Sequence, residues 1–118
     1  INSNGVAAMR VVRVRADGSI VWNKKAGGDG YQDMGHALAL NQNGNVLMVA
    51  GMKQPNSGDS NIKLWGYDPE TGNRLYTRNI TEGDYGLGAF GVVAAYDNGF
   101  LVTSSTLIKT DSLGLFGN

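Results

Sequence analysis

Apolar residues in this chain fall into short runs separated by turn-forming dipeptides. The stretches Val46–Ala50 and Gly99–Val102 have the length of β-strands, and an Asn-Gly pair, Asn43-Gly44, stands just before the first of them. Asn-Gly and Asp-Gly pairs supply the positive φ angles that tight hairpins require. No segment keeps the 3.6-residue period of an amphipathic helix. The pattern therefore predicts an all-β fold with almost no helix.

The chain repeats itself with a period of about 54 residues. Gly28-Asp29 recurs as Gly83-Asp84, and Asn43-Gly44 recurs as Asn98-Gly99, each 55 residues further on. The segment 18–22 resembles the segment 72–76 at a separation of 54 residues. Self-similarity at a fixed period is the sequence signature of repeat architectures. We therefore expect one structural unit that is built more than once.

Each repeat contains four strand-like runs, which is the strand count of a β-propeller blade. We expect an all-β fold of β-propeller blades, each a four-stranded antiparallel sheet, with about two and a half blades in this single segment of 118 residues. Two strands over 9–26 are followed by a full blade over 36–80 and a partial blade over 89–118. From the central channel outward, the expected strands are 36–41 and 89–96, then 45–51 and 100–104, then 9–16, 62–68 and 106–111, and finally 19–26, 73–80 and 115–116.

The connections between these strands are of two kinds. Compact turns close one end of each sheet, and long polar loops over 27–35, 52–61 and 81–88 lie at the other end. Binding residues concentrate on loops that a rigid scaffold carries. The long-loop end is therefore the expected functional face.

The segment 68–76 carries a resemblance to a known family. It reads Asp-Pro-Glu-Thr-Gly-Asn-Arg-Leu-Tyr and is similar to the tryptophan-docking motif of quinoprotein-type β-propellers, Asp-x-x-Thr-Gly-Lys-x-x-Trp. Tyr76 stands where that family has Trp, and Asn73 stands where Lys is usual, whereas Trp22 keeps the Trp after a shorter turn. The chain also resembles the propeller repeats of large secreted bacterial proteins. An aromatic side chain at the start of the outer strand is expected to lie over the neighbouring blade.

The resemblance implies a fold and a location but no single activity, because such repeats serve enzymes, binding proteins and adhesins alike. It implies an extracellular, cell-surface or periplasmic protein. The vicinal cysteine pair of many family members is missing, since the chain has no cysteine. The resemblance therefore carries over no residues for a quinone cofactor, and we expect no cofactor and no thiolate metal site.

Candidate ligand-binding residues lie in and beside two of the long loops. Carboxylates there suit Ca²⁺ or sugar hydroxyls, although the repeated Gly-Asp pair favours turn capping. Exposed tyrosines beside them suit sugar stacking or packing at blade junctions. The chain's only histidine opens an innermost strand, where it either lines the channel mouth or makes a structural hydrogen bond. The candidates are Asp29, Tyr31, Asp33, His36, Asp84 and Tyr85, with Glu82 as a further loop carboxylate.

No catalytic residue is predicted. The lone histidine has no serine and aspartate around it in a recognisable nucleophile motif. A single histidine without cysteines also makes no zinc site.

Charge and hydropathy exclude two classes of partner. Ten basic and ten acidic residues cancel, which removes the cationic footprint expected of a protein that binds nucleic acid or an anionic membrane. The apolar runs are far shorter than the roughly 20 residues of a membrane span. Three arginines, Arg10, Arg13 and Arg15, share one expected strand and are interpreted as a solvated strand rather than a binding face.

We therefore expect a non-enzymatic binding or scaffold module that recognises a glycan or a protein through its long-loop face. Two alternatives remain open: the propeller portion of a larger enzyme whose catalytic residues lie outside this segment, and a self-associating spacer or filament subunit. The expected strands do not make a whole number of blades. Further blades, in cis or in trans, are accordingly expected partners.

Overall fold

The computed structural model describes residues 9–26, 32–54, 61–80, 91–103 and 107–115. All regular secondary structure in these residues is β-strand. The strands are β1 (Met9–Val14), β2 (Ile20–Ala26), β3 (Gln32–Leu40), β4 (Leu47–Gln54), β5 (Asn61–Tyr67), β6 (Arg74–Ile80), β7 (Gly91–Ala94), β8 (Phe100–Thr103) and β9 (Leu107–Thr110).

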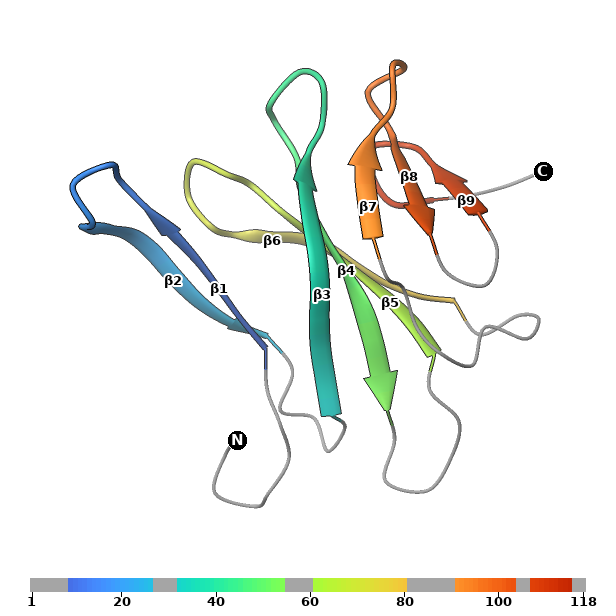
Figure 1. Ribbon diagram of the computed structural model, residues 1–118, viewed down its shortest axis with the longest axis horizontal. Coiled ribbons are helices and arrows are strands. Elements are labelled where there is room, and N and C mark those ends of the chain that lie inside the picture. Colours follow the sequence, from blue (N-terminus) through green and yellow to red (C-terminus); the bar gives the residue numbers. More distant parts are fainter. Residues whose placement is uncertain (1–8, 27–31, 55–60, 81–90, 104–106, 116–118) are drawn as a thin grey trace.

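Three antiparallel sheets lie side by side in chain order (Figure 1). We call them the first sheet (β1–β2), the central sheet (β3–β6) and the last sheet (β7–β9). Within each sheet, strands that pair are also neighbours along the chain, so hairpins suffice to connect them. The prediction of an all-β chain built from antiparallel sheets is confirmed.

The central sheet extends further than the hydrophobic pattern predicts. β3 begins at Gln32 rather than at residue 36, and β4 continues to Gln54 rather than ending at residue 51. Residues 32–35, expected in a loop, pair with residues 51–54. His36 is an extra, unpaired residue in β3, and such a bulge interrupts the alternation by which a strand is recognised.

The other strand ends differ from the expected ranges by one or two residues where the structure describes them. The expected outer strand at 115–116 is not formed at Leu115, and Phe116 lies outside the described residues. Strand ends shift easily because side-chain pattern does not fix the last backbone pair.

The central sheet buries apolar side chains on both of its faces. Between the central and last sheets, Met48, Ile62, Leu64, Phe100 and Val102 are completely buried. A second cluster fills the space between the first and central sheets and consists of Met9, Val11, Trp22, Val49, Trp65 and Tyr67. Full burial of one such side chain contributes about 1.5–3 kcal/mol. Stacking of one sheet on the next is therefore the main source of stability.

Trp22 of β2 docks on the turn between β5 and β6. The indole lies so close to Gly72 that a Cβ added there would come within 2.6 Å of its ring. Its Nε1–H donates a hydrogen bond to the Pro69 carbonyl at 2.9 Å, and its ring stacks with Tyr67 at a centroid distance of 6.4 Å. The turn of one sheet is thus the seat for an aromatic side chain of the preceding sheet.

Tyr76 of β6 repeats this arrangement one sheet further along. A Cβ added at Gly114, in the turn after β9, would come within 2.6 Å of the Tyr76 ring. On its own sheet the ring covers Gly66, where a side chain would collide with it. The prediction that Trp22 and Tyr76 pack on the neighbouring sheet is confirmed.

The five tight turns share one backbone pattern. In each turn, a residue with positive φ donates its N–H to a carbonyl three or four residues earlier. The residues concerned are Gly18, Gly44, Gly72, Asn98 and Gly114. The sequence pointed to a glycine in every turn, but in the turn 95–99 the positive angle falls on Asn98, at φ 73°. Asparagine tolerates this region better than other non-glycine residues.

Replacing Trp22 tests how much the docked ring contributes to stability. Trp22→Ala leaves a cavity between two sheets, so we expect the free energy of unfolding to fall by about 3–5 kcal/mol. Trp22→Phe keeps most of the ring but removes the donor to Pro69, and we expect a smaller loss, with about 1 kcal/mol from the hydrogen bond. Urea denaturation measures both. The control Tyr96→Ala, at a side chain 88% exposed, is expected to change stability by less than about 0.5 kcal/mol.

Two glycines separate backbone strain from crowding of the docked ring. Gly18 and Gly72 both have positive φ, but a Cβ at Gly18 meets nothing within 4 Å. Gly18→Ala should therefore cost only the conformational strain, about 1–2 kcal/mol. Gly72→Ala should cost about 1–3 kcal/mol more, because the new methyl collides with Trp22. Equal losses of stability in the two variants would show that the Trp22 ring does not depend on Gly72.

Candidate functional site

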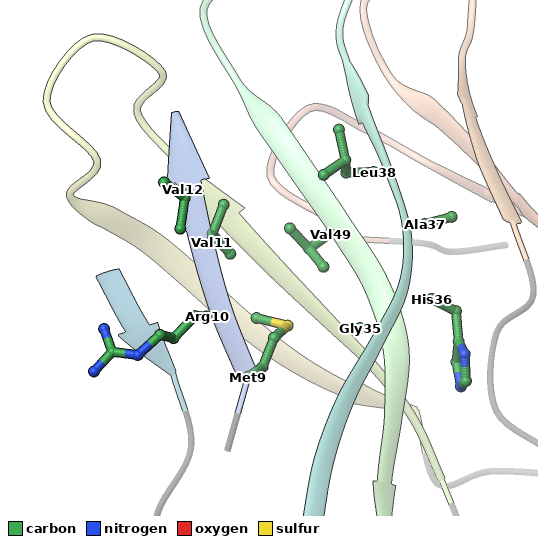
Figure 2. Close-up of a pocket in the computed structure, with 9 residues that line it drawn as sticks. All are labelled: Met9, Arg10, Val11, Val12, Gly35, His36, Ala37, Leu38 and Val49. Atoms are coloured by element: carbon green, nitrogen blue, oxygen red, sulfur yellow. The ribbon is translucent and has the colours of Figure 1, made fainter. Parts of the chain in front are cut away.

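A groove runs between β1 and the β3–β4 hairpin, and we call it the β1–β3 groove (Figure 2). It consists of two adjoining hollows of about 300 and 400 Å³. Val11, Val12 and Leu38 line both hollows. The groove thus lies where the first sheet ceases to cover the central sheet.

The walls of the groove are mainly apolar and open to solvent, although Arg10, Arg13 and Glu70 also line it. Val12 and Val14 come from β1, Leu38 and Leu40 come from β3, and all four side chains are exposed. Contiguous exposed apolar surface of this kind marks interaction sites in soluble proteins. The arrangement suits an apolar or peptide ligand better than a small charged one.

Gly35 allows β1 to approach β3 at one end of the groove. A Cβ at Gly35 would lie 2.7 Å from the Met9 sulfur and 3.1 Å from a Val49 methyl. The two strands meet here without an intervening side chain on β3. From this contact the first hollow reaches Leu38, and the second hollow continues from Leu38 to Leu40.

His36 is the one predicted site residue whose side chain the structure describes. It is exposed, and it is the bulged residue of β3. It borders the β1–β3 groove, but Figure 2 shows it projecting on the side of β3 that faces away from Met9. Bulges re-aim side chains in this way. The expectation that His36 opens its strand is wrong, because β3 begins at Gln32, and its role in binding stays a prediction.

Only one of the other candidates falls within the described residues, and only its backbone is described. Asp29, Tyr31, Asp84 and Tyr85, together with Glu82, lie outside the described residues. The backbone of Asp33 lies in β3 opposite Lys53 rather than in the loop where it was expected. The prediction that these residues bind a ligand therefore stays a prediction.

Arg10, Arg13 and Arg15 are exposed, and the guanidinium group of each makes a hydrogen bond. Arg10 donates to the Asn23 side chain at 3.0 Å, and Arg15 donates to the Ser19 hydroxyl at 3.2 Å. Arg13 donates to the Pro69 carbonyl at 2.6 Å, the same carbonyl that Trp22 engages. Arg13 thus helps to fasten the first sheet to the central one.

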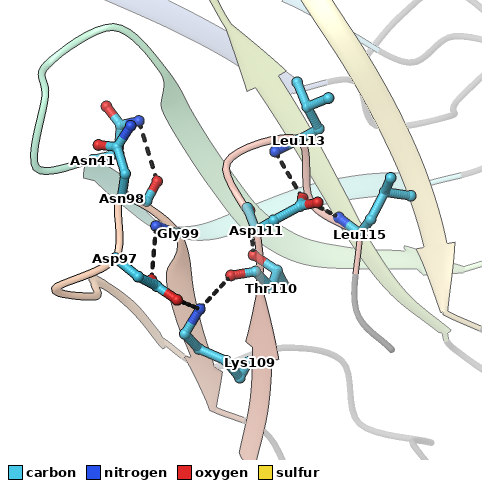
Figure 3. A network of polar contacts seen from close by, with 9 residues as sticks. All are labelled: Asn41, Asp97, Asn98, Gly99, Lys109, Thr110, Asp111, Leu113 and Leu115. Carbon is cyan, nitrogen blue, oxygen red and sulfur yellow. Dashed lines mark hydrogen bonds and ion pairs between the residues drawn. The ribbon is translucent and has the colours of Figure 1, made fainter. Parts of the chain in front are cut away.

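A polar network fastens the last sheet to the central sheet at the tight-turn end (Figure 3). Asn41 donates from Nδ2 to the Asn98 carbonyl at 3.3 Å, and the Asn98 side chain accepts from the Asn43 N–H at 2.8 Å. Asp97, beside Asn98, accepts from Lys109 at 2.8 Å. Turns of adjacent sheets are therefore bonded directly to each other.

Asp97 is held in its ionised form by this network. The Lys109 ammonium, and secondarily the Gly99 N–H, lower the pKa of the Asp97 carboxyl below its ordinary value. Asp17 behaves alike in the first turn, where hydrogen bonds from the Ser19 hydroxyl and N–H lower the pKa of its carboxyl. Both carboxylates stabilise turns rather than a reactive centre.

Tyr76 carries a buried hydroxyl without a hydrogen-bond partner in the described part of the chain. Burial raises the pKa of Tyr76 far above its ordinary value, and the Arg78 guanidinium lies over its ring at 5.0 Å. The hydroxyl therefore stays protonated at neutral pH. Its position between Gly66 and Gly114 is that of a packing residue.

The groove contains residues that the sequence did not single out. Leu38 and Leu40 alternate with Ala37 and Ala39, so the segment is apolar on both faces. A strand that is apolar on both faces is typical of one covered on both sides. This pattern, together with a first unit of only two expected strands, is the signal in the sequence that could have located the groove.

Comparisons with known proteins add no further assignment. No protein-family model matches this chain, and no curated protein resembles it closely enough to count as a relative. Over the described ranges, no three histidine, aspartate or glutamate side chains are grouped as metal ligands. The same ranges contain no helix long and apolar enough to cross a membrane.

Asp97 gives the protein an acid-sensitive contribution to stability. Its folded-state pKa is lowered, so the contribution is present above the unfolded pKa and is lost as the pH falls through the folded pKa. We expect Asp97→Asn to flatten the dependence of the free energy of unfolding on pH between about pH 5 and pH 2. Lys109→Met, which keeps the carboxylate but removes its main partner, should flatten it too. Urea titrations across this range test the expectation, and unchanged slopes in both variants would contradict it.

Proposed function

We propose that this chain is part of a β-propeller of the quinoprotein-like repeat type that serves as a non-enzymatic binding or scaffold module. The module recognises a glycan or a protein, and it acts outside the cell, on the cell surface or in the periplasm. The proposal combines the sheet architecture with the resemblance of segment 68–76 to the tryptophan-docking motif.

The observation that carries the proposal is the repeated docking of an aromatic ring on the next sheet. Trp22 on Gly72 and Tyr76 on Gly114 join successive sheets through equivalent parts. Radial stacking of near-identical four-stranded sheets is how a propeller buries its apolar faces. The four strands of the central sheet, paired in chain order, fit one blade of such an assembly.

The rigid sheets support a ligand role for the end opposite the tight turns. β2 ends at Ala26 and β3 begins at Gln32, while β6 ends at Ile80 and β7 begins at Gly91. These strand ends lie at the end of the sheets away from the tight turns (Figure 1). The connections that carry Tyr31 and Tyr85 start and finish there, and connecting segments on a rigid scaffold are where binding residues concentrate.

A tyrosine comparison tests this function. We expect the chain to bind members of a glycan array or a panel of extracellular matrix proteins. The double variant Tyr31→Ala with Tyr85→Ala should weaken that binding about tenfold or more, as loss of aromatic stacking does. The matched control is Tyr96→Ala, at an exposed tyrosine of the tight-turn end. Binding that survives the double variant, or that Tyr96→Ala reduces equally, would reject the proposed face.

A further inference from the structure

The strand pairing shows which residues of the central and last sheets occupy equivalent positions. Val49 of β4 pairs with Leu38 and Trp65, and Val102 of β8 pairs with Val92 and Ile108. Leu38 and Val92 therefore occupy the same position in their sheets. The next row is likewise shared by Leu40, Leu47 and Tyr67 in the central sheet and by Ala94, Phe100 and Thr110 in the last sheet.

The equivalent positions differ sharply in burial. Val92 is 7% exposed, because the β3–β4 hairpin of the preceding sheet covers it, whereas Leu38 is 60% exposed. Phe100 is fully buried, whereas its counterpart Leu47 is only partly so. Leu38 and Leu47 are thus the more open counterparts of covered residues in the last sheet, whereas Leu40 and its counterpart Ala94 are both exposed.

The edge of β1 that faces this surface carries no strand within the described residues. β1 pairs with β2 alone, whereas its counterpart β5 pairs with both β6 and β4. The correspondence holds in register, since Met9 opposes Ala26 as Ile62 opposes Ile80. An unpaired strand edge is a template for a further strand.

The two features meet in the β1–β3 groove. Its hollows border the free edge of β1 on one side and Leu38 and Leu40 on the other. The groove is continuous with the packed interface formed by Met9, Val11 and Val49. A ligand there would extend an existing interface rather than begin a new one.

We infer that the β1–β3 groove receives a two-stranded β-hairpin of the same repeat, which adds to the edge of β1 and covers Leu38 and Leu40. The interface between the central and last sheets shows which side chains such a hairpin presents. There the hairpin β3–β4 faces the last sheet with Ala37, Ala39, Val46, Met48 and Ala50. The occupant is accordingly a hairpin with small and medium apolar side chains at alternating positions, bound by β-augmentation. The inference rests on the repeat architecture of the proposed function and not on its glycan or protein ligand.

A second folded copy of this chain does not fit the groove. Its β3–β4 hairpin is paired with its own β5, and its β7–β8 hairpin is paired with its own β9. In the order seen in the central sheet, β4 or β8 of the second copy would have to lie beside β1, and both of these strands are already paired on both edges. A hairpin that is not already part of a sheet is the occupant that the geometry favours.

The probe for this inference is a synthetic, fluorescently labelled peptide with the sequence of residues 32–54, which spans β3 and β4. An isolated hairpin is marginally stable in water, so pairing with an edge is expected to fold it. We expect saturable binding to the intact chain by fluorescence anisotropy. We also expect slower amide hydrogen exchange over 9–14, because the peptide backbone pairs with β1.

Matched variants locate the binding surface. Leu40→Asp places a charge in the groove and should weaken binding about tenfold or more. Leu75→Asp changes a leucine of the same 47% exposure on β6 and should leave binding unchanged. A peptide carrying Val49→Pro lacks a backbone donor in its second strand and should fail to bind, which tests the pairing without altering the protein.

Several outcomes would overturn the inference. They are absence of peptide binding to the folded chain, equal loss in Leu40→Asp and Leu75→Asp, and unaltered exchange over β1. Self-association of the chain that Leu40→Asp abolishes, without peptide binding, would assign the groove to a second copy instead. Loss of peptide binding with intact glycan or protein recognition would reject this inference alone and leave the proposed function standing.

Discussion

The fold depends on an aromatic ring of one sheet resting on a glycine in the turn of the next. Trp22 and Gly72 make this contact between the first and central sheets, and Tyr76 and Gly114 make it between the central and last sheets. Each glycine has positive φ and leaves no room for a side chain. One residue therefore shapes a hairpin turn and also fixes how far away the neighbouring sheet lies.

This double role ties local structure to stacking. The Pro69 carbonyl lies in a turn and not in a strand, and it accepts hydrogen bonds from both Trp22 and Arg13 of the preceding sheet. Asn98 joins the turn of the last sheet to that of the central sheet in a comparable way. Stability in such an array is shared between units and the interfaces between them. The first sheet depends most on its neighbour, because it has only two strands in the described chain and an isolated two-stranded hairpin is marginally stable in water.

The sequence predicted what local chemistry determines and missed what depends on neighbours. The positions of the tight turns and the packing role of Trp22 follow from dipeptides and repeat spacing, so they could be predicted from the sequence. The length of β3 could not, because the bulge at His36 interrupts the alternation of side chains and separates residues 32–35 from the apolar run that follows. The groove was missed for another reason. Leu38 reads as a core residue, and only the position of β1 shows that nothing in the described chain covers it.

The same groove raises the question of how an open, apolar sheet edge avoids indiscriminate pairing. Charged side chains on an edge strand discourage edge-to-edge aggregation, and β1 carries Arg10 and Arg13 at exposed positions. Hydrogen bonds to Asn23 and to the Pro69 carbonyl hold both guanidinium groups against the protein's own surface. A strand that approaches β1 must therefore accommodate fixed positive charge as well as match the apolar rows of Leu38 and Leu40. These two demands together select for a hairpin of defined register over an arbitrary extended chain.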